Sequence, residues 1–193
     1  MKCALIGEKL GHSYSKLIHE AFGLYSYELV SLPRDRVGEF MENGDFDAFN
    51  VTIPYKRTVM PYCSYISPEA QKIGSVNTVI RTQDGLHGFN TDYFGFKSMA
   101  ARAGIDFAGK KVVILGSGGT SLTARAVAAD CGADRITVVS RSGEYNYENL
   151  EKLSDCEVLI NTTPVGMYPN NGSSAVKLDS FPRCEAVLDV IYN

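Results

Sequence analysis

The feature that most constrains the fold is a buried strand followed by a glycine turn and an alanine-rich helix, VVILGSGGTSLTARAVAADCG at residues 112–132. Three further apolar runs of the second half are nearly continuous rather than alternating, at residues 136–139, 158–160 and 186–191. Such runs are typical of parallel strands that helices cover on both faces. The second half is therefore predicted to be an α/β domain around a parallel sheet.

The first half is less regular but has the same character. Four apolar runs alternate with helical stretches, at residues 3–6, 27–30, 49–53 and 76–80. Between the halves, Tyr93 to Ala103 has apolar residues near helical spacing, and Gly104 follows as a helix-ending glycine. We predict a connecting helix here, a boundary near residue 100, and an α/β fold in both domains, 1–100 and 101–193.

Composition narrows the classes of partner. The 193 residues are 45% hydrophobic and carry a net charge of -3, so no basic field exists to attract nucleic acid or an anionic membrane. The five cysteines are scattered without a CxxC pair, so no metal site is predicted and the thiols are expected to be reduced. No apolar segment is long enough to cross a bilayer or to serve as a signal sequence, and we predict a cytoplasmic protein.

The glycine turn has the order expected of a dinucleotide site. Gly116 permits the tight turn, Gly118 and Gly119 let a pyrophosphate approach the backbone, and the N–H groups of the helix start face that anion. A plain strand-to-helix turn is the alternative, because Ser121 stands where the GxGxxG pattern has its third glycine. No GK[ST] follows, which disfavours a P-loop hydrolase. The candidate cofactor residues of this turn are Gly116, Ser117, Gly118, Gly119 and Thr120.

The two following strands end in further candidate cofactor segments. The first ends in Ser140, Arg141 and Ser142, with no acid to read a ribose, whereas Arg141 can stack on adenine or pair with a 2′-phosphate. This favours NADP, and a solvated strand-end charge is the alternative. The next strand runs into a polar turn that either lies beside the cofactor or is merely structural, and its candidate residues are Thr162, Thr163, Pro164, Gly166 and Met167.

In the first half, Lys56 follows a strand whose exit is stiffened by Pro54. A lysine partly shielded from water can pass protons, whereas an exposed one stays a cation, and both readings are open for this residue. Four other polar residues of this half also have two possible roles when each is considered by itself. Ser13 and Ser15 could hold a carboxylate or merely cap a helix, Asn77 interrupts an apolar strand, and Asp92 could cap the connecting helix.

Taken together and in order, eight motifs resemble the shikimate dehydrogenase family: HSYS, NVTIPYK, GSVNTV, GFNTDYFGF, GSGGTS, VVSRS, NTTPVGM and LDVIYN. The resemblance implies a substrate domain followed by a Rossmann-type NADP domain. It implies NADP-dependent reduction of 3-dehydroshikimate to shikimate in aromatic amino acid biosynthesis, by a monomer or homodimer. Shikimate and 3-dehydroshikimate are thus the expected small-molecule substrates.

The family's residue roles transfer by matching motifs. Ser13 and Ser15 become carboxylate binders, and Lys56 and Asp92 become the catalytic pair. The other substrate residues hold the ring hydroxyls, line the site or reach the substrate from the second domain: Thr52, Asn77, Thr91 and Tyr192, with Asp92 also holding a hydroxyl.

Three departures from the family pattern leave alternatives. Lys16 stands where family members commonly have a proline. Ser140-Arg141-Ser142 replaces an Asn-Arg-Thr motif that a further basic residue follows in the family. This second departure predicts a weaker NADP preference than usual, although Arg141 remains. The chain stops at Asn193, where the family continues through another strand and helices. We therefore expect either a fragment of a longer enzyme, truncated at the C-terminus, or a shortened relative with impaired turnover. A quinate/shikimate dehydrogenase with relaxed cofactor use and a catalytically silent NADP- or substrate-binding module are the alternative functions.

Overall fold

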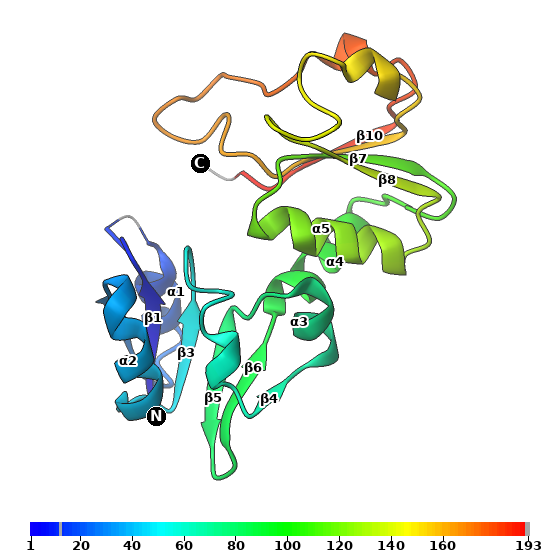
Figure 1. Cartoon of the computed structure of the whole chain (residues 1–193). Coiled ribbons are helices and arrows are strands. Elements are labelled where there is room, and N and C mark those ends of the chain that lie inside the picture. Colours follow the sequence, from blue (N-terminus) through cyan, green and yellow to red (C-terminus); the bar gives the residue numbers. More distant parts are fainter. Residues whose placement is uncertain (12, 192–193) are drawn as a thin grey trace. The chain divides into compact units, whose positions relative to one another are not determined.

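The computed structural model describes residues 1–11 and 13–191, and the chain divides into two compact units, Met1–Thr91 and Asp92–Asn193 (Figure 1). The division falls in the first turn of α4 (Thr91–Arg102). This helix confirms the predicted connecting helix, and Gly104 beyond it has a φ of +68°. The assignment of domains 1–100 and 101–193 stays a prediction. No helix in the described part of the chain is long and apolar enough to cross a membrane.

The first unit is built on a six-stranded mixed sheet in the order β2-β1-β3-β5-β6-β4. Strands β1, β2 and β3 run parallel, β5 is antiparallel to both β3 and β6, and β4 is parallel to β6. The strands are β1 (Lys2–Gly7), β2 (Ser26–Ser31), β3 (Ala48–Val51), β4 (Tyr65–Ile66), β5 (Thr78–Thr82) and β6 (Gly85–Phe89). The helices are α1 (Ser15–Ala21), α2 (Val37–Asn43) and α3 (Pro68–Ile73), with 3-10 turns at Arg34–Arg36 and Met60–Tyr62.

The core of this unit lies against the central strands. Ile6 of β1 and Val51 of β3 are buried, and α2 adds Val37 and Met41 to the same cluster. Tyr55, from the turn after β3, is also fully buried there. The apolar runs that predicted β1, β2, β3 and β5 therefore correspond to strands, whereas β4 and β6 were missed. Strand β6 has the sequence GLHGF, whose two glycines and lack of β-branched residues hide it from a propensity argument.

The second unit contains a parallel four-stranded sheet in the order β10-β9-β7-β8. Its elements are β7 (Lys111–Leu115), α5 (Gly119–Asp130), β8 (Arg135–Val139), β9 (Val158–Asn161) and β10 (Ala186–Asp189), with 3-10 turns at Leu150–Leu153 and Leu178–Ser180. Helices α4 and α5 contact each other, since the Tyr93 hydroxyl donates to Asp130 Oδ2 at 2.7 Å (Figure 1). This confirms the predicted α/β class with a parallel sheet.

The prediction of helices on both faces of this sheet is wrong for one face. The face that presents Val113 and Leu115 is covered by loops and the two 3-10 turns, which contribute the buried Leu153 and Phe181. The connecting segments on this side are rich in Asn, Gly, Ser and Pro, which compete with helix formation by favouring turns.

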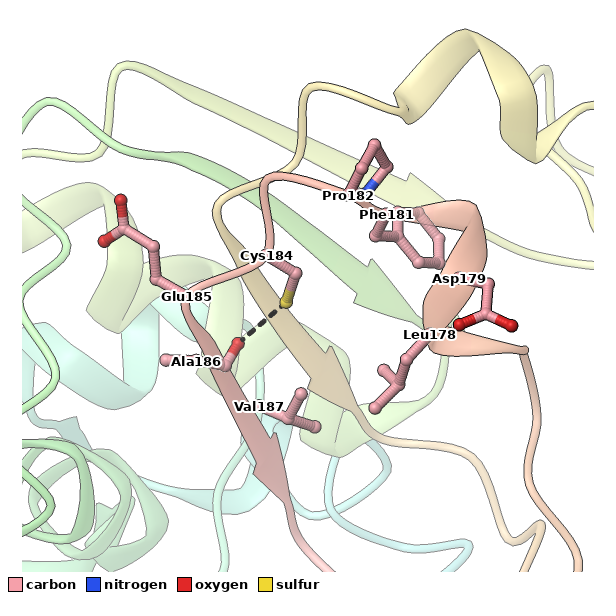
Figure 2. Close-up of a pocket in the computed structure, with 8 residues that line it drawn as sticks. All are labelled: Leu178, Asp179, Phe181, Pro182, Cys184, Glu185, Ala186 and Val187. Carbon is pink, nitrogen blue, oxygen red and sulfur yellow. Dashed lines mark hydrogen bonds between the residues drawn. The ribbon is translucent and has the colours of Figure 1, made fainter.

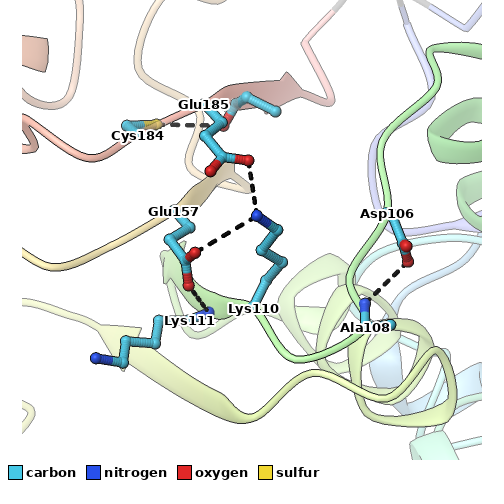
Figure 3. Close-up of polar contacts among 8 residues, drawn as sticks. Asp106, Ala108, Lys110, Lys111, Glu157, Cys184 and Glu185 are labelled. Carbon is cyan, nitrogen blue, oxygen red and sulfur yellow. Dashed lines mark hydrogen bonds and ion pairs between the residues drawn. The ribbon is translucent and has the colours of Figure 1, made fainter.

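Charged residues join the amino-terminal ends of three strands of this sheet (Figure 3). Lys110 Nζ lies 2.8 Å from Glu185 Oε2 and 3.4 Å from Glu157 Oε1. The second oxygen of Glu157 accepts a hydrogen bond from the Lys111 N–H at 3.0 Å. These residues precede or begin β7, β9 and β10, so their contacts reinforce the strand register at the edge opposite the strand exits.

A second ion-pair group continues this edge to β8. Lys111 Nζ lies 2.8 Å from Asp155 Oδ2, and Arg135 pairs with the other carboxylate oxygen. The hydrogen bond from Lys111, helped by Arg135, lowers the pKa of Asp155. The Lys111 backbone N–H and Lys110 likewise lower the pKa of Glu157. Both carboxylates are therefore held in their charged form by the fold.

We expect Asp155→Asn to destabilise the chain near neutral pH and to have a smaller effect in acid. Because the folded pKa of Asp155 is depressed, its contribution is present above the unfolded pKa, about 3.9, and is lost as the pH falls through the folded pKa. Urea unfolding near pH 7 and near pH 3 measures the difference. Asp134→Asn is the control, an exposed acid before β8 with no ion pair among the described residues. An equal effect of Asp155→Asn at both pH values would contradict the prediction.

Candidate active site

The exits of β1 and β3 lie side by side at one edge of the first sheet. Ile6 pairs with Val51, and the Thr52 N–H donates to the Ile6 carbonyl at 2.9 Å. Gly7 permits this approach, because a Cβ at that position would lie 2.7 Å from Thr52 Cγ2. The segments that leave these two strands carry four of the predicted site residues, Ser13, Ser15, Thr52 and Lys56.

Lys56 lies in a turn that is anchored on both sides. Tyr55 and Val59 are fully buried, and the Tyr55 hydroxyl donates to the Leu32 carbonyl at 2.5 Å. The carbonyl of Lys56 accepts from the Val76 N–H at 2.8 Å. Lys56 is half-buried, which differs from the fully exposed lysine that was one of the two interpretations of the sequence. The turn, which contains a cis Ile53–Pro54 bond, therefore fixes the backbone from which this ammonium group projects.

The serine loop is shaped by one local hydrogen bond. Ser13 Oγ accepts from the Ser15 N–H at 3.2 Å, and Tyr14, the N-cap residue of α1, makes no side-chain capping bond. Both serines are half-buried. The Ser13 hydroxyl thus contacts the first backbone N–H of α1, although the N-cap position itself is Tyr14.

Asn77 and Thr91 lie at the same edge of the first sheet. Asn77 immediately precedes β5, is 7% exposed, and accepts hydrogen bonds through Oδ1 from the Thr91 N–H at 2.9 Å and the Thr91 hydroxyl at 3.2 Å. The expectation that this buried amide finds partners is confirmed. Its backbone joins two strands, since the Val51 N–H donates to the Asn77 carbonyl and the Asn77 N–H donates to Phe89.

The remaining substrate candidates lie in the second unit or beyond the described residues. Asp92 follows Thr91 in the first turn of α4 and is half-buried. Tyr192 lies outside the described residues. No group of three or more potential metal ligands occurs in residues 1–11 and 13–191.

The three candidate cofactor segments leave neighbouring strands at one edge of the second sheet. Leu115 of β7 pairs with Val139 of β8 and with Asn161 of β9, so the glycine turn lies between the other two exits. Gly116 has a φ of +98°, and a Cβ there would lie 3.0 Å from Thr162 Oγ1. The turn at Thr162 and Thr163 therefore packs directly on the glycine turn.

The glycine turn leads into α5 with open space around it. A Cβ added at Gly118 or Gly119 would meet no atom within 4 Å, and Ser117 and Thr120 are exposed. The first N–H groups of α5 are a helix start that can bind an anion. Ser121, the departure from the third glycine, is 2% exposed, so a small side chain is what this position needs for packing.

The turn after β9 is held by Asn161, which is 8% exposed. Its Nδ2 donates to both carboxylate oxygens of Asp189, and its Oδ1 accepts from the Thr163 hydroxyl at 2.7 Å. Thr162 Oγ1 donates to the Leu115 carbonyl at 2.6 Å. Beyond it, Pro164 and Met167 are exposed and Gly166 is half-buried, with a φ of +98°.

The segment after β8 turns back on itself. The Ser140 N–H donates to the Tyr145 carbonyl at 3.1 Å, and Arg141 and Ser142 are exposed at the rim. Burial raises the pKa of Tyr147, and the positive charge of Arg141 opposes that shift. Arg141 is thus a cation at the exit of the strand next to the glycine turn.

Other residues of the described part of the chain line two further hollows. One of about 420 Å³ lies along the edge strand β10, and its lining includes Leu178, Phe181, Cys184 and Val187 (Figure 2). The other, of about 620 Å³, lies in the first unit and is lined in part by Tyr27, Asn50 and Thr78. Neither is lined by a residue that the sequence predicted for the site.

Comparison with known proteins agrees with the resemblance. The shikimate dehydrogenase substrate binding domain matches residues 5–79. A protein named shikimate dehydrogenase (NADP(+)) from Clostridium perfringens is 38% identical over 98% of this chain and 78% of its own length. The chain belongs to the shikimate dehydrogenase family.

Solved shikimate dehydrogenases have the same fold. Shikimate dehydrogenase 1 from Peptoclostridium difficile has a TM-score of 0.86 at 36% identity, covering 100% of this chain and 78% of that one. The Thermus thermophilus enzyme, in complex with NADP(H) and shikimate, has a TM-score of 0.85 at 30% identity, with 100% and 79% covered. A quinate dehydrogenase from Corynebacterium glutamicum, in complex with NAD, shares the fold at 24% identity.

Sequence reasoning overlooked two polar residues of this shikimate dehydrogenase homologue. Asn50 and Thr78 pair across β3 and β5 and are joined by a hydrogen bond of 3.1 Å from Nδ2 to Oγ1. The sequence did carry a signal for them, because Asn50 and Thr78 each interrupt an apolar run.

We expect Gly116→Ala to destabilise the chain by about 1–3 kcal/mol, because a side chain is strained at positive φ and its Cβ would press on Thr162. Urea unfolding monitored by circular dichroism measures the loss. Gly119→Ala is the matched control, since that glycine opens α5 with free space around it and alanine favours helix. The prediction fails if both substitutions change stability equally.

Proposed function

We propose that this shikimate dehydrogenase homologue reduces 3-dehydroshikimate to shikimate with NADPH and catalyses the reverse reaction with NADP+. The observation that most supports this is the convergence of half-buried polar groups from separate segments on one edge of the first sheet. A cyclic hydroxy acid requires such a combination of a carboxylate site, hydroxyl partners and a proton donor.

The substrate would be held through its carboxylate and ring hydroxyls. In this proposal Ser13 and Ser15 donate to the carboxylate, while Thr52 and Asn77 contact the hydroxyls and Thr91 lines the site. Tyr192 is proposed to reach the substrate from the second domain. The half-burial of the serines supports this, because hydrogen bonds to a charged group are stronger where water is partly excluded.

Lys56 and Asp92 are the proposed catalytic pair. During reduction the Lys56 ammonium group gives a proton to the carbonyl oxygen and stabilises the charge that develops there. Asp92 orients the ammonium group and the adjacent hydroxyl. The buried residues on either side of Lys56 support the assignment, because they fix the backbone from which the proton donor projects.

Three features of the second unit support NADP as the cofactor. The free space over Gly118 and Gly119 leaves room for a pyrophosphate at the start of α5, with Ser117 and Thr120 beside it. Arg141, flanked by Ser140 and Ser142, would face the 2′-phosphate. Thr162, Thr163, Pro164, Gly166 and Met167 would border the nicotinamide, which supplies the hydride when bound.

We expect Lys56→Ala to lower kcat for shikimate oxidation by about 10²–10⁴-fold with little change in NADP+ affinity, because it removes a proton-transfer group outside the cofactor unit. Nicotinamide absorbance reports turnover, and fluorescence titration reports cofactor binding. Arg57→Ala, at the exposed neighbouring position of the same turn, is the control and should retain activity. A parallel loss of cofactor affinity in Lys56→Ala would contradict the assigned role.

We expect Arg141→Ala to raise the KM for NADP+ by about tenfold while changing the KM for NAD+ much less, because only NADP+ carries the 2′-phosphate that a guanidinium group binds. Steady-state kinetics with both cofactors measures this. Arg125→Ala, an exposed arginine within α5, is the control. Equal changes in the two KM values would contradict the prediction, because Arg141 would then attract either cofactor by its charge and not bind the 2′-phosphate.

An NADP- or substrate-binding module without turnover is the second candidate; the chain spans 78% of the length of its Clostridium perfringens relative. Titrating the chain with shikimate and NADP+ separates the two, since binding without a change in nicotinamide absorbance supports the module. Turnover with quinate would instead assign a quinate/shikimate dehydrogenase.

A further inference from the structure

The orientation of the Asn77 side chain is fixed by its donors. The Thr91 backbone N–H can only donate, and it lies 2.9 Å from Oδ1, so this atom is the carbonyl oxygen of the amide. The hydroxyls of Thr91 and Thr78 lie at 3.2 and 3.0 Å from the same oxygen. With three donors around it, this oxygen has no lone pair left for a ligand.

Thr78 connects Asn77 to the interior of the sheet. Its Oγ1 donates to Asn77 and accepts from Asn50 Nδ2 at 3.1 Å. Asn50 Oδ1 accepts in turn from the Tyr27 hydroxyl at 2.7 Å. Tyr27 is 2% exposed and stacks on His19 with ring centroids 3.9 Å apart, so the chain of hydrogen bonds ends on a buried ring.

Each hydroxyl or amide in this chain has a defined direction. Tyr27 donates to Asn50, Asn50 donates to Thr78, and Thr78 donates to Asn77. Since Thr78 accepts from Asn50, its single proton is directed at Asn77. Asn50 Nδ2 also lies 3.4 Å from the Asn77 backbone carbonyl, which can only accept, so the orientation of the Asn50 amide is fixed and Thr78 is left to donate to Asn77 Oδ1.

We propose that Thr78 is a positioning residue that holds the Asn77 amide in one orientation, so that its Nδ2 can only donate to a substrate oxygen that offers a lone pair. Resting on the proposed function, this predicts that the shikimate oxygen facing Asn77 accepts its hydrogen bond from Nδ2. A ring position without an oxygen there would leave the donor unpaired, which is how a site of this kind discriminates between cyclic acids.

The first test needs no ligand. Hydrogen exchange of the Thr91 amide, followed by NMR, reports the bond to Asn77 Oδ1. We expect Thr78→Val to accelerate that exchange at least about tenfold, because the loss of one net hydrogen bond of about 1.4 kcal/mol frees the amide to rotate. The control Thr82→Val removes a hydroxyl from the same strand that bonds the Gly85 carbonyl instead. Unchanged Thr91 exchange in Thr78→Val would overturn the proposal.

The second test separates orientation from donation. Asn77→Asp retains an oxygen for Thr91 but removes the N–H donors, so we expect Thr91 protection to persist while shikimate affinity falls about tenfold or more. Thr78→Val should raise the KM for shikimate and leave that for NADP+ unchanged. Shikimate binding by Asn77→Asp at wild-type affinity would overturn the donor role. If the wild-type chain fails to bind shikimate, the proposed function fails, while the ligand-free exchange still decides the role of Thr78.

Discussion

Parallel strand pairing is the constraint on which the rest of this structure depends. Because neighbouring parallel strands end at the same edge of a sheet, the segments that follow them are brought together whatever their separation in sequence. In the first unit this joins the exits of β1 and β3, to which the antiparallel pairing of β5 adds Asn77. In the second unit it joins the exits of β7, β8 and β9.

The opposite edges of the second sheet have a different role. The amino-terminal ends of the strands carry ion pairs, in which Lys110 and Lys111 contact acids that precede β9 and β10. These contacts hold the register, whereas the carboxyl-terminal ends keep exposed glycines and hydroxyls. One edge thus contributes to stability and the other remains available for a ligand, which is the division expected of an open α/β sheet.

Buried anchors give the flexible segments a defined geometry. Tyr55 and Val59 hold the turn that carries Lys56, and hydrogen bonds connect the buried Tyr27 to Asn77 through Asn50 and Thr78. In each case a polar group at the edge of the first sheet is connected to a residue whose position the hydrophobic core dictates. The functional roles of these groups are proposals, but the placement itself follows from core packing.

The sequence by itself determined the α/β class, eight of the ten strands found in residues 1–11 and 13–191, the connecting helix and membership in the shikimate dehydrogenase family. It could do so because apolar periodicity and ordered motifs are local properties of the chain. It did not reveal the glycine-containing β6, the loops that cover one face of the second sheet, or the partners of Asn77. These were decided by the tertiary structure. Hydrogen bonds such as those of Asn50 with Thr78 join residues 28 positions apart, and only strand register determines which polar groups meet.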